Sequence, residues 1–369
     1  MIASEALADA SIKTSKSEGT NVGTFVGIAH NTYHESGKQV PADSFESRYR
    51  VVLDPNASTL TAYKLNLTGP SIDINTACAS SLVAMHQAVN SLQAGDCDAA
   101  LVGGVSVSYP QYGGYATSDG KIFSASGECR PLDARSDGSV PADGVAAIII
   151  KPLSAAREAN DRIYAVIEGH AIGTDGAVDK IGFTVPSSSG QAKVIREAIL
   201  TSGVDVNSIR YVEMHGSGTT IGDALEFQGL QQAYADCQGS APKKLKKHSR
   251  SSTPARRGQS SAAGSRSASR APQRAQQVFV GSNKGNFGNS EAASGLTSLI
   301  KATLAVHKGV VPPMRRLGDV NELVSLEQSL IQPLRSHLKL NTGDRVGVTA
   351  LGYGGVNAHC IITSANSIV

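Results

Sequence analysis

The stretch 68-TGPSIDINTACASSLVAMHQAVNSL-92 decides the fold, and Cys78 lies at its centre. It predicts a short strand over residues 71–74, a turn of small residues, and a helix whose apolar residues recur at spacings of three and four. A thiol at such a strand-to-helix turn faces the free amides and the positive end of the helix, which favour a thiolate and lower the pKa. Cys78 is therefore a candidate nucleophile, and the alternative is a buried structural cysteine.

Apolar strands alternate with helices on both sides of this stretch, a pattern typical of an α/β protein. Strands are predicted at 22–28, 99–108, 145–151, 164–169, 209–214, 278–280, 345–350 and 360–363, and helices at 3–12, 153–158, 191–202, from 223 onward and at 296–308. The polar stretch 30–63 lacks periodicity and predicts a surface loop that contains His30 and His34. The loop 118–144 is rich in glycine and aspartate and predicts turns; without calcium-loop spacing it predicts no metal site.

Composition excludes several classes of protein. Of the 369 residues, 40% are hydrophobic, and no apolar run approaches the roughly 18 residues of a membrane-spanning helix. The first residues lack the basic and apolar regions of a signal peptide. The five cysteines show no CxxC spacing, so neither a disulfide framework nor a zinc site is expected. The sequence predicts a cytoplasmic protein that does not bind a membrane.

The segment 239–276 differs from the rest of the chain. It holds four Lys, six Arg and no acidic residue, although the whole chain has a net charge of only +3, so the remainder is acidic. The segment consists largely of Ser, Ala, Gly and Arg and has no aromatic residue on which a nucleic acid base could stack. It predicts a disordered surface insertion, and no nucleic acid partner is expected.

Four loops of small residues follow apolar strands, and they carry Cys78, His215, Asn289 and the segment 353–357. In α/β sheets, binding and catalytic groups collect at such strand ends. A thiol, an imidazole and free amides suit acyl transfer. The thiolate attacks a thioester, the imidazole handles protons and the amides stabilise the oxyanion.

Five segments of the chain match motifs of one family. NTACASSLVAMHQAV (75–89) resembles the nucleophile motif of the β-ketoacyl synthases, usually DTACSSSLVA, and VEMHGSGTTIGDALE (212–226) resembles their VEAHGTGTxxGDPxE. GSNKGNFGNSEAASGLTSLIK (281–301) resembles GSVKSNIGHxEAAAGxxGLIK, and LGYGGVNAHCII (351–362) resembles FGFGGTNAHVIL. The loop 131–153 matches as well. The chain is therefore identified as a member of this family, apart from its basic insertion.

The resemblance implies a thiolase-like fold, with two similar α/β halves stacked in five layers (αβαβα). The first half, 1–207, would carry the nucleophile, and the second, 208–369, would contain the insertion at 239–276. The family has a further N-terminal stretch with a first strand, so the N-terminal part of the first half is expected to be missing. The family is usually dimeric, holds no permanent cofactor, and receives acyl thioesters on the phosphopantetheine arm of an acyl or peptidyl carrier protein.

The resemblance also implies a role for each matching residue. Cys78 would accept the acyl group, and His215 would be the first catalytic histidine. The amides of Cys78 and Tyr353 would form the oxyanion hole, and the Tyr353 ring would gate the acyl pocket. The supporting residues would be Lys284, Glu291, Gly354, Gly355 and Asn357. His86, His170, His307 and His359 match no catalytic position and are interpreted as structural.

Asn289 departs from the family pattern, because it stands where the second catalytic histidine is expected. Asparagine can donate a hydrogen bond, but it cannot exchange a proton at neutral pH. Decarboxylation of a malonyl thioester would need such a proton exchange. The set Cys78, His215 and Asn289 resembles the terminal ketosynthase-like domain of the fungal tenuazonic acid synthetases, which combine peptide and polyketide synthesis. That resemblance implies a non-decarboxylative Dieckmann cyclisation that releases a tetramic acid. The alternatives are ordinary decarboxylative condensation and a non-catalytic fragment that docks carrier proteins.

Overall fold

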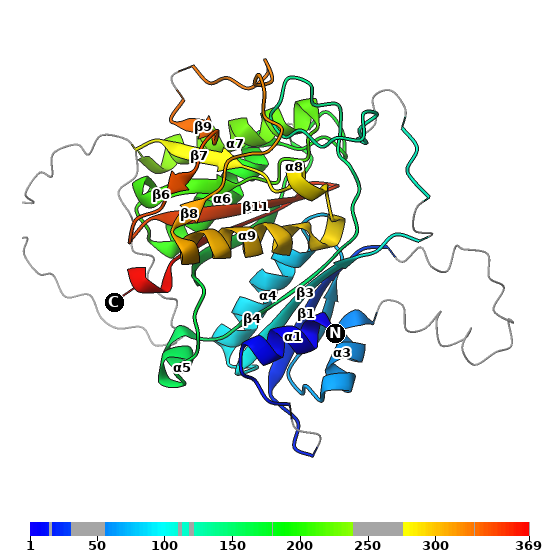
Figure 1. Ribbon diagram of the computed structural model, residues 1–369, viewed down its shortest axis with the longest axis vertical. Helices are drawn as coiled ribbons and strands as arrows, with labels where there is room; N and C mark the ends of the chain where they lie inside the picture. The colour runs from blue at the N-terminus through cyan, green and yellow to red at the C-terminus, as the bar shows by residue number, and fades with distance from the viewer. Residues whose placement is uncertain are drawn as a thin grey trace, which may run out of the picture.

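The computed structural model describes residues 1–14, 17–30, 56–109, 113–117, 122–178, 180–238, 276–327 and 329–368. His34 and the basic insertion, up to residue 275, lie outside the described residues. Within these ranges the chain forms two larger sheets with helices between them and on both outer sides (Figure 1). The alternation of apolar strands and helices therefore produced the expected α/β fold.

The first sheet has the strand order β2 (Ser71–Ile74), β1 (Val22–Ile28), β3 (Ala99–Ser106) and β4 (Gly144–Ile150) among the described residues. The first three strands are parallel, and β4 pairs antiparallel with β3. Every residue of β1 is buried, as expected for a central strand that is covered on both faces. Helices α1 (Ile2–Asp9) and α3 (Ala57–Leu65) cover the outer face of this sheet.

The second sheet has the order β5 (Val166–Thr174), β12 (Val356–Thr363), β11 (Arg345–Gly352), β6 (Ile209–Glu213), β7 (Val278–Gly281) and β9 (Ile331–Pro333) within the described ranges. The long helices α6 (Ser188–Ser202) and α7 (Thr220–Gln238) cover its outer face. The chain passes from the first sheet to the second between β4 and β5. This point precedes residue 207, where the sequence placed the boundary between the two halves.

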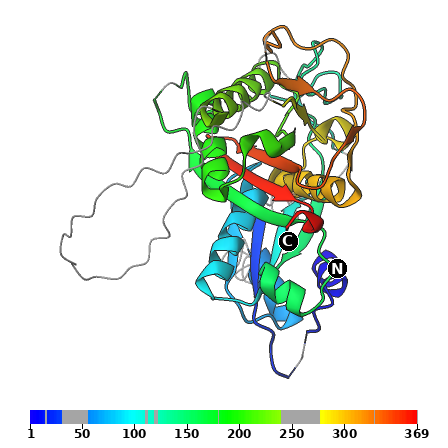
Figure 2. The same cartoon turned by 90° about the vertical axis from the view of Figure 1, so that its left-hand side faces the viewer.

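Helices α4 (Ser80–Ala94) and α9 (Ser294–Lys308) lie between the two sheets and contact both of them. Figures 1 and 2 show the resulting order of five layers in the described part of the chain: helices, sheet, helices, sheet, helices. The largest core cluster joins residues of α4 and α9 to residues of both sheets. The end of α4 nearest β2 therefore lies deep in the molecule, which determines where Cys78 is placed.

The remaining described elements are short: α5 (Leu153–Glu158), α8 (Lys284–Phe287), the strand pair β8 (Val310–Val311) with β10 (Leu338–Lys339), and the 3₁₀ helices η2 (Val206–Ser208), η3 (Glu291–Ala293) and η4 (Ala365–Ser367). The prediction of a loop throughout 30–63 was wrong for its end, where α3 forms. The amide of Ser58 in the first turn of α3 donates to Asp73 in β2 over 2.9 Å, and Asn66 ends the helix in a left-handed conformation. Both Ser58 and Ala62 are buried, so α3 is held by contacts with the sheet rather than by a strong local pattern.

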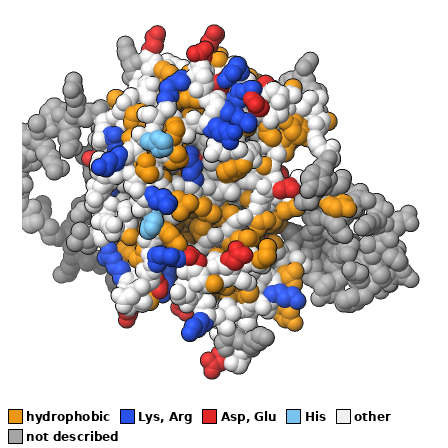
Figure 3. Space-filling model, in the orientation of Figure 1, with side chains coloured by type: hydrophobic (Ala, Val, Ile, Leu, Met, Phe, Trp, Pro, Cys, Tyr) orange, Lys and Arg blue, Asp and Glu red, His pale blue; other side chains and the backbone are white. Residues whose placement is uncertain are grey.

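Hydrophobic side chains gather across the middle of the face seen in Figure 1, over α9 and β4 (Figure 3). Leu304 in α9 and Val145 in β4 belong to the exposed hydrophobic residues of these two elements. Among the described residues, no helix combines the length and the apolar character needed to cross a membrane.

Candidate active site

Cys78 lies in the turn between β2 and α4, as the sequence predicted. Ala77, the residue before it, has a φ of +53°, a conformation that costs free energy for a residue with a side chain. The hydroxyl of Ser80 holds this turn, because it accepts from the amide of Thr76 at 2.8 Å and donates to the carbonyl of Ala77 at 2.6 Å. A single buried side chain thus fixes the strained backbone that presents the thiol.

The turn is packed tightly against neighbouring backbone. A Cβ atom added at Gly352, at the end of β11, would lie 2.2 Å from the carbonyl oxygen of Thr76. A Cβ atom at Gly27 in β1 would lie 2.5 Å from the amide nitrogen of Ser81. Strand β3 and helix α9 each approach the start of α4 through a further glycine. Both sheets and α9 therefore constrain the position of the nucleophile.

The polar surroundings of Cys78 come from the opposite half of the chain. Sγ lies 3.5 Å from Nδ2 of Asn289, which donates to it, and the hydroxyl of Ser294 donates to the Cys78 carbonyl over 3.1 Å. Burial raises the pKa of the thiol above its usual value, and Glu291 adds to the rise; the Asn289 hydrogen bond and the Lys284 charge oppose it. The predicted lowering of this pKa was wrong, because removal from water outweighs the groups that favour a thiolate.

The side chain of Asn289 has a fixed orientation. Its backbone amide donates to the carbonyl of Val140 at 2.7 Å, and its own carbonyl accepts from the amide of Ala142 at 2.9 Å. Its Oδ1 accepts from the backbone amide of Glu291 at 3.2 Å. Since the oxygen is engaged there, the NH₂ group faces Cys78. The residue gives the thiol a hydrogen-bond donor and no proton acceptor.

His215 follows β6 and is buried. The carboxylate of Glu226 accepts from the amides of His215 and Gly216, at 2.7 and 2.8 Å, and Nζ of Lys284 donates to the His215 carbonyl at 2.6 Å. Burial, assisted by the Lys284 charge, holds the pKa of the imidazole well below its usual value. His215 is therefore neutral at physiological pH, and its Nδ1 has no hydrogen-bond partner in the described part of the chain.

Lys284 connects the thiol and the imidazole electrostatically. It is the first residue of α8, its side chain is buried, and its charge acts on the pKa of both Cys78 and His215. Burial lowers the pKa of Lys284 itself, whereas the nearby Cys78 and Glu226 raise it. A cation in this position favours a thiolate at residue 78 and a neutral ring at residue 215.

The loop between β11 and β12 contains the predicted gate. Gly354 and Gly355 both have a φ of +95°, which allows a tight turn closed by the bond from the Gly355 amide to the Gly352 carbonyl, 2.9 Å long. Tyr353 at the tip is 57% exposed, and its ring meets that of Phe183 edge to face, with centroids 6.4 Å apart. Its roles in gating and in the oxyanion hole stay predictions.

Asn357 holds this loop rather than reaching the thiol. Its Nδ2 donates to Oδ1 of Asp175 at 2.6 Å, and Oδ2 of Asp175 accepts from Nζ of Lys180 at 3.2 Å. The carboxylate also accepts from the amide of Ser187. Sequence reasoning missed Asp175 because the strand predicted at 164–169 extends in the structure to Thr174, directly before this residue. It also missed Glu226, whose place three residues after Asp223 in the helix resembles an ordinary exposed position.

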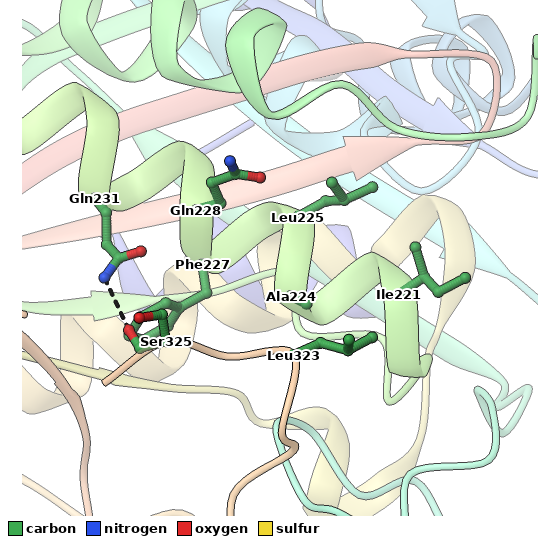
Figure 4. A pocket seen from close by; sticks show the side chains of 8 residues that line it. All are labelled: Ile221, Ala224, Leu225, Phe227, Gln228, Gln231, Leu323 and Ser325. Atoms are coloured by element: carbon green, nitrogen blue, oxygen red, sulfur yellow. Dashed lines mark hydrogen bonds between the residues drawn. The ribbon is translucent and has the colours of Figure 1, made fainter. Parts of the chain in front are cut away.

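One further pocket in the described part of the chain lacks the groups needed for acyl transfer. A surface pocket of about 390 Å³ lies against α7 and is lined by Ile221, Ala224, Leu225, Phe227, Gln228, Gln231, Leu323 and Ser325 (Figure 4). It is lined by apolar and neutral polar side chains, without an acid, base or thiol. Within the described residues no group of three or more His, Cys, Asp or Glu side chains could hold a metal ion. All five cysteines lie in the described part and are free thiols.

Two family models match the chain. The N-terminal domain of β-ketoacyl synthase matches residues 1–156, and the C-terminal domain of the same family matches 164–247 and 252–318. The interval between them contains the point where the chain passes from the first sheet to the second. The family comparison and the sheet topology therefore divide the chain at the same place.

Relatives and solved structures agree with the family models. The hybrid PKS-NRPS synthetase TAS1 of Cordyceps militaris is 63% identical over the whole chain, which spans 23% of that protein. The synthetase of the same name from Pyricularia oryzae is 46% identical over 94% of the chain, which spans 20% of it. Ketosynthase twelve of the bacillaene polyketide synthase of Bacillus amyloliquefaciens is 28% identical and superimposes with a TM-score of 0.81, covering 97% of this chain and 58% of its own. The chain therefore belongs to the β-ketoacyl synthase family, a family of acyltransferases with the thiolase-like fold.

Proposed function

We propose that this ketosynthase-type domain takes an acyl group from a carrier protein onto Cys78 and releases it by a non-decarboxylative Dieckmann cyclisation. The observation that carries the proposal is the 3.5 Å contact of Sγ of Cys78 with the amide of Asn289, at the position where the family has a second histidine. An amide can stabilise a thiolate or an oxyanion but cannot exchange the proton that malonyl decarboxylation would need. His215 is then the only proton-transferring group of the proposed set.

The first step is an exchange of thioesters. Sγ of Cys78 loses its proton to the neutral imidazole of His215 and attacks the carbonyl carbon of the aminoacyl thioester on the phosphopantetheine arm. The new carbon–sulfur bond forms as the bond to the carrier thiol breaks, and the proton passes from His215 to the departing thiolate. The raised pKa of Cys78 makes this proton transfer necessary, because little free thiolate is present beforehand.

The second step closes the ring. His215 takes a proton from the carbon between two carbonyl groups of the bound β-ketoacyl aminoacyl group, a carbon acidic enough for a weak base. The resulting carbanion attacks the thioester carbonyl, so that a carbon–carbon bond forms and the bond to Sγ breaks. Asn289 donates to the departing sulfur, and His215 returns the proton to it. The ring contains the amide nitrogen, and the product is a tetramic acid.

The relatives support an aminoacyl substrate, because the synthetases named above combine peptide and polyketide synthesis. The substrate would reach the site on an acyl or peptidyl carrier protein, with phosphopantetheine as part of the substrate rather than as a cofactor of this chain. We place these reactions in the cytoplasm.

In the described part of the chain β2 pairs only with β1, so its other edge is open for pairing, and Ile72 on β2 is exposed. Such an open edge favours association of two copies into a homodimer.

The experiment offers the purified chain two substrates. An N-acetoacetyl aminoacyl pantetheine thioester should give the ring product and free pantetheine, followed by mass spectrometry, and the Cys78→Ala variant should give neither. A mixture of malonyl and acyl pantetheine thioesters should give no carbon dioxide and no extended chain. Carbon dioxide release with chain extension would show ordinary condensation instead. Failure to load any acyl group onto Cys78 would favour a non-catalytic carrier-docking fragment.

A further inference from the structure

The carboxylate of Glu213 is buried beneath the proposed site and holds a charged partner. Glu213 ends β6, and Nζ of Lys301 in α9 donates to its Oε2 at 2.6 Å. The hydroxyl of Tyr211 donates to the same oxygen at 2.6 Å and accepts from Lys301 at 3.0 Å. Because Tyr211 and Glu213 are two positions apart in a strand, both face α9. A buried ion pair contributes little to stability once desolvation is counted, which leaves room for another role.

The second oxygen of the same carboxylate reaches the loop that carries Lys284. Oε1 of Glu213 accepts from the backbone amide of Asn283 at 2.6 Å. Asn283 directly precedes Lys284, and its side chain forms hydrogen bonds with two hydroxyl groups of α9. The ammonium of Lys284 donates in turn to the carbonyl of His215, two residues after Glu213. The carboxylate therefore fixes the backbone from which Lys284 projects.

Helix α9 extends the connection to Cys78. Its first residue, Ser294, donates to the carbonyl of Cys78, and the amide of Leu296 donates to the hydroxyl of Ser81 at 3.0 Å. Lys301 lies two turns further along the same helix. One oxygen of Glu213 thus holds the helix that contacts the nucleophile, and the other holds the loop that carries the cation.

We infer that Glu213, together with Lys301 and Tyr211, is a positioning unit that sets the Lys284 ammonium relative to Cys78. This inference rests on the proposed role of Cys78 as the acyl acceptor. The Coulomb attraction between an ammonium and a thiolate varies steeply with distance in a buried site, so a small displacement changes the reactivity of the thiol. Glu213 also favours the charged form of Lys284. The three residues act through Lys284 and do not touch the acyl group.

The test compares two double variants of the purified chain. Glu213→Gln with Lys301→Met removes both charges of the unit without leaving one unpaired. The matched control is Glu168→Gln with Arg345→Met, which removes the ion pair between β5 and β11, 2.7 Å long and partly buried. The rate of Cys78 alkylation by iodoacetamide is measured against pH by intact mass, and the melting temperature is measured in parallel.

The first double variant should alkylate about three- to tenfold more slowly at pH 8, with the rate profile moved to higher pH, because Lys284 no longer assists the thiolate fully. The control should keep the wild-type profile even if its melting temperature falls. The single variant Lys301→Arg, which keeps a charge and several donors, should keep most of the wild-type rate. If the double variant does not fold, Tyr211→Phe should give a smaller shift in the same direction.

An unchanged pH profile in the folded double variant, or in Tyr211→Phe when that variant has to be used, would overturn the positioning role. Equal rate losses in the two double variants would also overturn it, because they would indicate a general loss of structure. A different result would contradict the proposed function. In that case Cys78 of the wild-type chain would react with iodoacetamide but would never be acylated by a pantetheine thioester. The two failures are therefore distinguishable.

Discussion

The amide of Asn289 donates to the sulfur of Cys78 over 3.5 Å, although the two residues are 211 positions apart in the chain. The contact has a defined direction, because the oxygen of the same amide is occupied by the backbone of Glu291. Asn289 can therefore stabilise a negative sulfur but cannot take its proton. Proton transfer falls to His215, which burial keeps neutral and able to accept. This division of work between an amide and a single imidazole is the basis of the proposed cyclisation.

Replacing Asn289 by alanine should slow the alkylation of Cys78. The hydrogen bond from Asn289 lowers the pKa of the thiol, so its loss moves this pKa further upward and leaves less thiolate. A rate about fivefold lower at pH 8 is expected, the factor that corresponds to a net hydrogen bond of about 1 kcal/mol. The rate is measured by stopping the alkylation at intervals and recording the intact mass. Asn286→Ala in α8 is the control. An unchanged rate would contradict the assigned donor.

Replacing Asn289 by histidine should restore a decarboxylating site. The imidazole would supply the second proton-transferring group. A positioned general acid or base raises the reaction rate by about 10²-fold or more. Carbon dioxide release from malonyl pantetheine is the measurement, and Asn289→Gln, which keeps an amide, is the control. If the histidine variant releases no more carbon dioxide than the wild type, residue 289 is not what prevents decarboxylation.

Gly352→Ala should damage the turn that presents the nucleophile. The added Cβ would lie 2.2 Å from the Thr76 carbonyl oxygen, so backbone rather than a flexible side chain must move. We expect a loss of about 1–3 kcal/mol in the free energy of unfolding, typical of overpacking, together with slower acyl loading. Gly182→Ala is the control, because nothing lies within 4 Å of its added Cβ. Urea unfolding separates the two variants, and equal stabilities would argue against this packing.

The sheets and the four strand-end loops could be predicted from sequence because each apolar strand is a local signal. The strand at Val22–Ile28 and the helix at Leu153–Glu158 have the predicted bounds. Helix α3 was missed because its residues have weak local preference and are held by Asp73 from a neighbouring strand. The pKa of Cys78 was predicted in the wrong direction for a similar reason. The effect of the helix end on the thiol can be read from neighbouring residues. The burial that raises the pKa comes from α9 and the Asn289 loop, which are distant in the sequence.

The supporting charges of the site were the least predictable part. Glu213 and Glu226 lie within a matched motif, but the sequence predicted no role for either. Nothing in the neighbouring residues distinguishes a buried carboxylate from an exposed one. Their roles depend on backbone amides brought together by folding: Glu226 receives those of His215 and Gly216, and Glu213 receives that of Asn283. Sequence patterns identify the groups that carry the chemistry more readily than the groups that hold them.

The contribution of Glu226 to the stability of the chain should fall as the pH rises through its titration. Burial raises its pKa from the usual 4.5 to about 7 in the folded state. Between these values the folded state keeps a proton that the unfolded state has lost, so the free energy of unfolding decreases with rising pH. Asp223, with a pKa raised to about 6, contributes in the same direction.

Glu226→Gln should therefore remove a negative contribution to the slope of the free energy of unfolding against pH between 4.5 and 7, so that the slope becomes more positive than in the wild type. It should also slow acyl loading, because the amide oxygen of glutamine cannot accept from both His215 and Gly216 as the carboxylate does. Urea unfolding at several pH values gives the slope, and Glu197→Gln on the exposed face of α6 is the control. The same slope in the Glu226→Gln variant and the wild type would show that folding leaves the pKa of Glu226 unchanged, so that its carboxylate is ionised at neutral pH. The negative charge beside His215 would then be permanent, and the imidazole would be a stronger base than its burial implies.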